Sequence, residues 1–186
     1  MMSLLGTVKR AILPAGKAPR TIQSGSFSGL EMELDLRGQT QLYLGLWERE
    51  VQPWVRVMST GIQTAIDVGT AQGEYLIYFL KRTGATRVFS FEPDASMWPA
   101  LDRNLALNGL SRDTRVIASA KFVGNHEDEE TTRLDALVSG VVGPCLVKVD
   151  VDGGEVDVLE GASRCLGLPA MRWLIETHSP DLERRC

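Results

Sequence analysis

The segment Asp67-Val68-Gly69-Thr70-Ala71-Gln72-Gly73-Glu74-Tyr75 joins a short apolar run, residues 64–68, to a helix-like stretch, residues 74–82. Two glycines lie between them, and glycine readily adopts the backbone angles of a tight turn and lets a ligand approach the main chain. The free N–H groups at the start of the following helix favour a carboxylate or phosphate. The segment is therefore typical of a ligand-binding turn between a parallel strand and its helix.

From residue 62 onward, short apolar runs alternate with helix-like stretches, which is typical of an α/β protein. Further strands are expected at residues 87–91, 115–118, 146–149 and 171–176, and further helices at residues 96–107 and 155–166. Right-handed crossovers between successive strands predict a Rossmann-like, mostly parallel sheet with helices on both faces.

The first 60 residues follow a different pattern. Residues 31–36 alternate acidic and apolar side chains, as a half-buried strand does. Residues 42–58 carry most of their apolar side chains on one helical face, with Pro53 as a break or a first turn. We expect residues 1–60 to form an N-terminal arm and cap that contributes to a substrate pocket, and residues 61–186 to form the core.

The composition of the 186-residue chain is that of a single soluble domain, with 44% hydrophobic and 24% charged residues. Its formal net charge of -4 argues against a general nucleic-acid-binding surface, and no apolar run approaches the roughly 20 residues that span a bilayer. We therefore expect no nucleic-acid partner and no membrane partner. Widely spaced cysteines without a CxxC pair indicate reduced thiols in a cytoplasmic protein rather than a zinc ribbon or a disulfide framework.

A carboxylate follows the second predicted strand. Phe91-Glu92-Pro93 places Glu92 19 residues after Gly73, where a carboxylate can accept hydrogen bonds from both hydroxyls of a ribose. Together with the glycine turn, it predicts a nucleoside-type ligand. The fingerprint GxGxxG is absent, because Thr70-Ala71-Gln72 fills the span between the glycines. A pyrophosphate ligand and a nicotinamide-dependent dehydrogenase are therefore disfavoured.

Five ionisable residues follow the fourth and fifth predicted strands, namely Asp150, Asp152, Glu155, Glu176 and His178. Asp152 and Glu155 either line the cleft or serve only the start of the next helix, where acids favour the helix dipole. Asp150 ends an apolar strand. An acidic side chain there destabilises the fold unless it forms an ion pair or takes part in binding or catalysis. Lys148 is expected on the opposite face of that strand.

His178 is either a general base near neutral pH or a satisfied structural group. The carboxylates together with His178 can in principle hold a divalent ion through oxygen ligands. Their spacing matches no known metal motif, however, so we predict no metal site.

Six segments taken together resemble the FkbM family of S-adenosylmethionine-dependent methyltransferases. The resemblance runs in unbroken order over residues 43–178. The segments are Asp67 to Tyr75, Phe91-Glu92-Pro93, Asn104 to Asn108, Leu134-Asp135, Lys148 to Glu155 with Leu159 to Ala162, and Ile175 to His178.

The resemblance implies a class I methyltransferase that transfers a methyl group from S-adenosylmethionine to a hydroxyl of a small molecule or glycan. The loop from Asp67 to Gly73 would hold the methionine part, Glu92 the ribose hydroxyls, and Ser119 would lie beside the adenine. The expected cofactor-binding residues are Asp67, Gly69, Thr70, Ala71, Gly73, Tyr75, Glu92, Pro93 and Ser119. The expected catalytic residues are Asp150, Glu176 and His178, with Asp150 and His178 the candidates for taking the hydroxyl proton.

The chain departs from the family at its C-terminal end. The family's sheet has seven strands, whereas this chain ends shortly after the fifth, residues 171–176. That strand is expected at an edge with its apolar faces exposed, a state that proteins usually avoid. Either a second chain covers it, or the early strand around Glu31 does, or the chain is a truncated form. We expect a homodimer, and the alternative function is a non-catalytic cofactor-binding module or a partner-dependent subunit.

Overall fold

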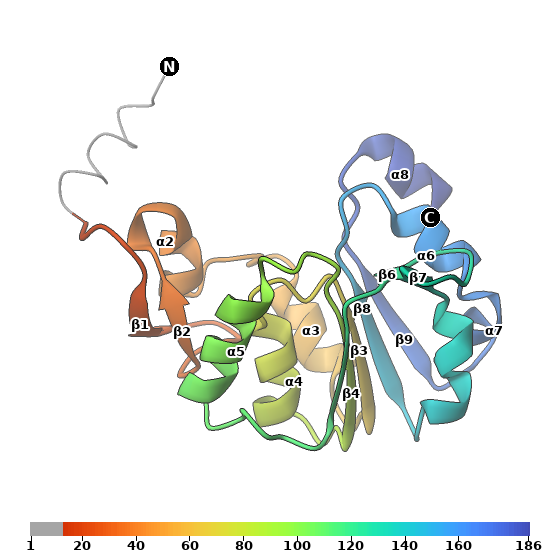
Figure 1. The fold of residues 1–186 in the computed structure, drawn as a ribbon, viewed down its shortest axis with the longest axis horizontal. Coiled ribbons are helices and arrows are strands. Elements are labelled where there is room, and N and C mark those ends of the chain that lie inside the picture. Colours follow the sequence, from red (N-terminus) through yellow and green to blue (C-terminus); the bar gives the residue numbers. More distant parts are fainter. Residues whose placement is uncertain (1–12) are drawn as a thin grey trace.

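Five parallel strands form the central sheet of the structure, a computed structural model that describes residues 13–186 (Figure 1). In the order in which they lie side by side, they are β5 (Val116–Ser119), β4 (Arg87–Phe91), β3 (Thr64–Val68), β8 (Cys145–Val149) and β9 (Met171–Ile175). The chain runs outward from β3 through β4 to β5 and then returns to β8 on the other side of β3. The predicted parallel α/β sheet is confirmed.

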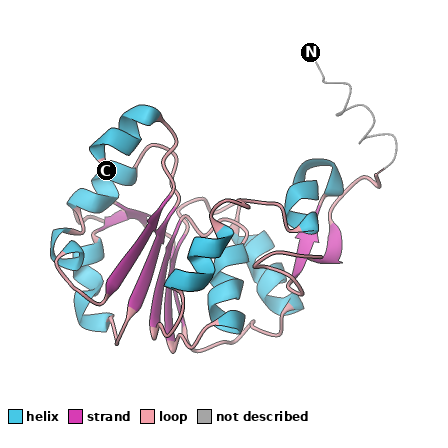
Figure 2. Ribbon diagram, turned by 180° about the vertical axis from the view of Figure 1, so that it is seen from behind, coloured by secondary structure: helices cyan, strands magenta, loops and turns pink. Residues whose placement is uncertain are grey.

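Helices cover both faces of this sheet, as predicted (Figure 1 and Figure 2). The helices on one face are α3 (Gln52–Met58), α4 (Glu74–Arg82) and α5 (Trp98–Leu107), and those on the other are the 3-10 helix η1 (Leu134–Gly140), α6 (Glu155–Glu160) and α7 (Ser163–Leu166). Because strand side chains alternate, neighbouring residues of β3 enter different cores. Ala65 belongs to the apolar cluster of α4, and Ile66 belongs to the cluster of η1, α6 and α7.

β3, α4 and β4 begin and end where the sequence predicts, and most other bounds differ by one or two residues. The continuous helix predicted at residues 155–166 is wrong, because the helix is divided into α6 and α7. At the division, a side chain on Gly161 would lie 1.9 Å from the carbonyl oxygen of Gly124. The carbonyl of Gly161 also accepts a hydrogen bond from the backbone of Asp135 instead of continuing the helix.

An antiparallel hairpin of β1 (Ala18–Thr21) and β2 (Glu31–Leu34) packs against α5 (Figure 1). Asn104 Oδ1 accepts a hydrogen bond from Glu33 N at 2.8 Å, and Asn108 bonds both backbone groups of Glu31. α2 (Leu36–Leu44) and α3, which has Pro53 in its first turn, complete the segment predicted as a cap. Part of the predicted arm, residues 1–12, lies outside the described residues.

β9 lies at an edge of the sheet: it pairs with β8, and no described strand pairs with its other side. The expectation that its apolar faces are exposed is wrong. Trp173, Leu174 and Ile175 are half-buried, Leu174 against one core and the other two against the second. The early hairpin does not cover this edge, because it lies at the other end of the molecule (Figure 1). The homodimer stays a prediction.

Three short elements complete the described chain. β6 (Phe122–Val123) and β7 (Thr131–Thr132) form a two-stranded sheet after β5, and α8 (Pro180–Arg185) lies beside α6. Within residues 13–186, no helix is both long enough and apolar enough to cross a membrane.

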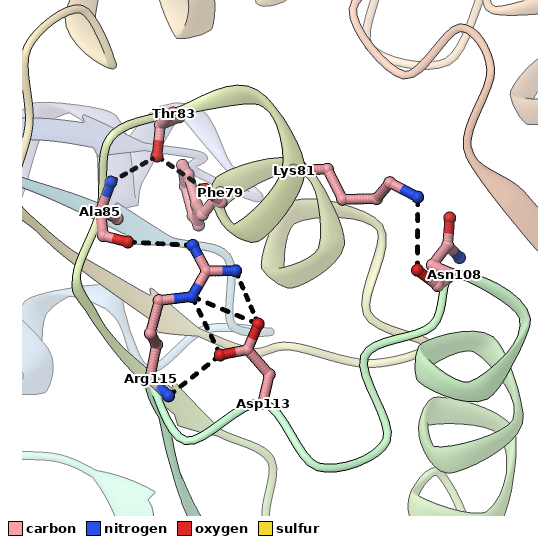
Figure 3. A network of polar contacts seen from close by, with 7 residues as sticks. All are labelled: Phe79, Lys81, Thr83, Ala85, Asn108, Asp113 and Arg115. Atoms are coloured by element: carbon pink, nitrogen blue, oxygen red, sulfur yellow. Dashed lines mark hydrogen bonds and ion pairs between the residues drawn. The ribbon is translucent and has the colours of Figure 1, made fainter.

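A polar network fixes the amino ends of β4 and β5, at the edge of the sheet remote from the strand carboxyl ends (Figure 3). Thr83 Oγ1 donates to Phe79 O at 2.6 Å and accepts from Ala85 N at 3.1 Å, just beyond the end of α4. Arg115 donates to Ala85 O at 3.2 Å and to both carboxylate oxygens of Asp113, the shortest contact being 2.6 Å. The turn before β4 is thereby tied to the start of β5.

Asp135 in η1 fixes the start of α7. Its carboxylate accepts hydrogen bonds from Ser163 Oγ at 3.0 Å, from Arg164 N at 2.9 Å and from Cys165 N at 3.0 Å. Burial alone would raise the pKa of Asp135, but the hydrogen bonds outweigh it and lower the pKa overall. The Leu134-Asp135 segment, one of the six on which the family resemblance rests, therefore has a structural role: it holds the start of α7.

We predict that Asp135→Ala lowers the free energy of unfolding at pH 7 by about 1–3 kcal/mol, because three donors lose a charged acceptor. Asp102→Ala, at an exposed position of α5, is the control and should change it by less than about 0.5 kcal/mol. Because the pKa is lowered in the folded state, the contribution is present at neutral pH and is lost as the pH falls below about 4. Urea unfolding at pH 7 and pH 3 measures both effects, and equal stability of the two variants at pH 7 would contradict this role.

Candidate functional site

A pocket of about 490 Å³ opens at the carboxyl ends of β3, β4 and β8, which is where ligands bind in open α/β sheets. Its volume suits a ligand of nucleoside size. The lining residues are Val68, Gly69 and Ala71 from the end of β3, Phe91, Glu92 and Pro93 from the end of β4, Lys121, Phe122 and Val123 after β5, and Asp150, Val151, Asp152 and Gly154 after β8.

Glu92 joins two walls of this pocket. Its Oε2 atom accepts a hydrogen bond from the backbone N–H of Ala71, and its Oε1 atom accepts one from that of Asp94, both at 2.8 Å. Ala71 has a positive φ of 46°, which is unfavourable for a residue with a side chain, so the bond to Glu92 holds a turn that the backbone alone disfavours. An ionised carboxylate offers about four acceptor positions, so two remain for a ligand.

The two glycines of the turn are required by packing within the protein. Both have positive φ, 85° at Gly69 and 93° at Gly73. A side chain on Gly69 would lie 1.9 Å from the carbonyl oxygen of Asp150, and one on Gly73 would lie 2.4 Å from Leu101 Cδ1. Gly69 lines the pocket, whereas Gly73 does not. The turn therefore brings the ends of β3 and β8 together and seats α4 on α5.

Asp67 is buried behind the turn. Its side chain is 0% exposed, and neither carboxylate oxygen accepts a hydrogen bond of ordinary geometry from any described residue. Burial raises the pKa of Asp67 to about 6, although the nearby Lys148 ammonium acts in the opposite direction. Asp67 does not line the pocket, so its carboxylate lies in a layer beneath it.

Lys148 is the cation of this buried layer. It is 3% exposed, donates to Asp150 Oδ2 at 2.8 Å and lies 4.2 Å from the centre of the Tyr75 ring. Burial acts to lower the pKa of Lys148, but Asp67 and Asp150 raise it overall, so the ammonium stays charged. The expectation that Lys148 and Asp150 point to opposite faces is wrong, because side chains two positions apart in a strand share a face.

The cap reaches the buried layer through Glu48, a residue that sequence reasoning missed. Glu48 accepts a hydrogen bond from the hydroxyl of Tyr75, and burial together with the Glu48 charge raises the pKa of that hydroxyl. Tyr75 itself is 3% exposed and lies off the pocket wall. No pattern in the sequence marks Glu48, because it lies in a stretch interpreted as an amphipathic helix.

Two other predicted cofactor-binding residues also lie off the pocket wall. Thr70 is buried, with its hydroxyl 2.9 Å from that of Ser90, and the Ser119 carbonyl accepts a hydrogen bond from Glu92 N at 3.1 Å. The wall after β5 is built by the next residues along the chain, among them Phe122, a residue that is 57% exposed. A two-residue strand such as β6 is too short to show a periodic pattern.

The three predicted catalytic residues do come together. One potential ligand atom from each of Asp150, Glu176 and His178 lies within 4.8 Å of the others. The bond between His178 Nδ1 and Glu155 Oε1, 2.8 Å long, is the largest of the causes that raise the pKa of His178. Burial and the Asp150 charge raise the pKa of Glu176. The pKa of each group therefore lies above its ordinary value.

Comparisons with known proteins support the fold. The chain is similar to the crystal structure of precorrin 8W decarboxylase from Methanobacterium thermoautotrophicum, with a TM-score of 0.50 and 18% identity over 73% of this chain and 66% of that chain. It is also similar to M. jannaschii TYW2 in complex with AdoMet, with a TM-score of 0.49 and 16% identity over 80% of this chain and 57% of that chain. The chain thus spans less than two thirds of the length of either protein. No protein family and no curated protein matches its sequence.

The buried Asp67 carboxylate has a consequence for stability. An acid whose pKa is raised in the folded state stabilises the fold fully at low pH and progressively less as the pH rises through that pKa. A rise from 3.8 to about 6 corresponds to about 3 kcal/mol at most. The neighbouring ionisable groups are Lys148, Asp150, Glu48 and Glu74, all of which remain in an Asp67→Asn variant.

We predict that Asp67→Asn raises the melting temperature of the ligand-free protein at pH 8, and that this gain shrinks as the pH falls to 5. Asp181→Asn, at an exposed position, should leave the melting temperature unchanged at both pH values. Differential scanning calorimetry between pH 5 and pH 8 tests the prediction. If Asp67→Asn melts at a lower temperature than the wild type at pH 8, the prediction is wrong. Interactions in the folded protein would then offset the cost of burying the ionised carboxylate.

Proposed function

We propose that this protein binds S-adenosylmethionine in the pocket beside Glu92 and transfers its methyl group to a hydroxyl of a small molecule or glycan. One observation carries the proposal: Glu92 lines a pocket of nucleoside size and keeps acceptor positions free at the end of the second core strand. A carboxylate at this place in a Rossmann-like sheet is suited to the two hydroxyls of a ribose. Membership of the FkbM family is part of the proposal.

An apolar part of the wall suits the adenine. Phe122 is 57% exposed although it is aromatic, and it lines the pocket together with Pro93 and Val123. A flat, apolar base can stack on an exposed aromatic ring, which removes apolar surface of both from water. Adenine in this position leaves the ribose next to Glu92.

The acidic side of the pocket suits the positively charged end of the cofactor. Asp150 lies on the wall, and the buried Asp67 carboxylate, which accepts no ordinary hydrogen bond from the described residues, lies beneath it. When bound, S-adenosylmethionine supplies a methyl group on a sulfonium sulfur: the acceptor oxygen bonds the methyl carbon, and the carbon–sulfur electron pair returns to sulfur. The residues of the chain then have to align the acceptor and take its proton.

The position of the cluster of Asp150, Glu176 and His178 beside the pocket supports a role of the cluster in removing that proton. Asp150 belongs both to the pocket wall and to the cluster, so an acceptor hydroxyl in the pocket can reach it. Glu155 holds Nδ1 of His178, which leaves Nε2 on the side of Asp150, 3.5 Å from Oδ1. General bases of this kind contribute about 10²–10⁴-fold to a rate.

A cofactor-binding module without turnover is the second candidate. The open edge of β9 among the described strands favours it, because an unpaired strand edge is a place where a partner chain can add a strand. This alternative predicts the same cofactor affinity, with no methyl transfer to any hydroxylated acceptor. Product formation with one acceptor from a panel of small alcohols, phenols and sugars separates the two candidates.

We predict that S-adenosylhomocysteine binds the purified chain and that NAD does not. Phe122→Ala should weaken this binding about tenfold, because stacking of a base on an aromatic ring contributes about 1–3 kcal/mol. Ile117→Ala, an exposed apolar residue of β5 away from the pocket, is the matched control and should bind as the wild type does. Isothermal titration calorimetry makes the comparison. Absence of S-adenosylhomocysteine binding, or equal binding of NAD, would refute the cofactor assignment.

A further inference from the structure

We propose that Asp150, Glu176 and His178 bind one divalent cation beside the cofactor pocket. They offer two carboxylate oxygens and one imidazole nitrogen, and these three atoms lie within 4.8 Å of one another. Two ligand atoms of the same ion lie no further apart than twice the metal–ligand bond, about 4–5 Å for divalent ions. The three side chains can therefore close on one ion with small rotations.

The histidine is held in the orientation that a metal ligand requires. Glu155 is 0% exposed, and its Oε1 atom accepts hydrogen bonds from the backbone N–H and from Nδ1 of His178, the latter at 2.8 Å. A carboxylate that binds one ring nitrogen fixes the tautomer and presents the other nitrogen to a metal. Nε2 of His178 accordingly faces Asp150 Oδ1 at 3.5 Å. The other oxygen of Glu155, Oε2, is buried and has no hydrogen-bond partner among the described residues.

The charges around the cluster are not balanced by protein groups. Asp150, Asp152, Glu155 and Glu176 surround a single imidazole. Lys148 is the one lysine or arginine that forms an ion pair with any of these acids in the described part of the chain, and it bonds Oδ2 of Asp150. Oδ1 of Asp150 and the whole carboxylate of Glu176 remain for an added cation. Mixed carboxylate and imidazole donors suit Mn²⁺ or a similar first-row ion.

The position of the metal site beside the pocket suggests a role for the cation in methyl transfer. This role rests on the proposed function, whereas the metal site itself does not. Three protein ligands leave coordination positions open, and Asp150 borders the pocket, so a hydroxyl oxygen of the acceptor can occupy one of them. A bound cation lowers the pKa of a coordinated oxygen group. With Asp150 and His178 occupied as metal ligands, the hydroxyl proton passes to water on the side of Asp152, whose side chain is 98% exposed, instead of directly to the cluster, and the oxygen attacks as an alkoxide.

The test is titration of the metal-stripped full-length chain with Mn²⁺ alone, followed by the electron paramagnetic resonance signal of the free ion. We expect one Mn²⁺ per chain and a loss of affinity of at least tenfold in Glu176→Gln and in Asp150→Asn. His126 and Asp128 form another histidine–aspartate pair, exposed and 3.2 Å apart, but among the described residues no third potential ligand joins them. Asp128→Asn is therefore the matched control and should bind Mn²⁺ as the wild type does.

Thermal unfolding shows whether each variant is folded. One folded variant, Glu176→Gln or Asp150→Asn, is enough for the comparison of Mn²⁺ affinity. Absence of Mn²⁺ binding at millimolar concentration, or binding by Glu176→Gln equal to that of the wild type, would overturn the proposal. Titration of the metal-free chain with S-adenosylhomocysteine is a separate experiment. If the chain binds S-adenosylhomocysteine and not Mn²⁺, the metal site is wrong and the proposed function stands. If it binds Mn²⁺ and not S-adenosylhomocysteine, the proposed function is wrong and the metal site stands.

Discussion

The hydrogen bond between the Glu92 carboxylate and the N–H of Ala71 shapes the candidate site. It holds the turn after β3 against the end of β4 at 2.8 Å, with Ala71 at a φ of 46°. The left-handed conformation costs about 1–2 kcal/mol, and a hydrogen bond to a charged acceptor contributes about 1.5–3 kcal/mol, so the bond is strong enough to maintain the turn. The same carboxylate then faces the pocket with its remaining acceptor positions.

Beneath this turn, the two carboxylates of Asp67 and Asp150 share a single ammonium group. Asp67 is fully buried without an ordinary hydrogen bond, and the ammonium of Lys148 is shared with Asp150. A buried carboxylate lowers the stability of a ligand-free protein, and such costs are typically found at functional sites. The same excess of acid extends to Glu176 and the residues around His178. A cofactor with a sulfonium centre and a divalent cation are both ligands that such a site favours.

The sheet could be predicted from the sequence because local signals and burial agree there. β3, α4 and β4 lie close to glycine or proline residues, and most of their buried residues are apolar. The meeting of Asp150 with His178 was also predictable, because the ends of parallel strands meet at one edge of a sheet. The interruption of the helix at Gly161 was not, since it depends on the distant Gly124. The same holds for Glu48 and Phe122, which reach the site through long-range packing that no local pattern records.

The central claim is that Glu92 binds the ribose of the cofactor as well as holding the turn. The most direct test compares S-adenosylhomocysteine with its 2′-deoxy analogue in calorimetric titrations of the wild type and of Glu92→Gln. We predict that loss of the 2′-hydroxyl weakens binding to the wild type at least tenfold, about 1.4 kcal/mol, and has a much smaller effect on Glu92→Gln. An equal loss of affinity in both proteins would mean that Glu92 shapes the pocket without touching the ribose.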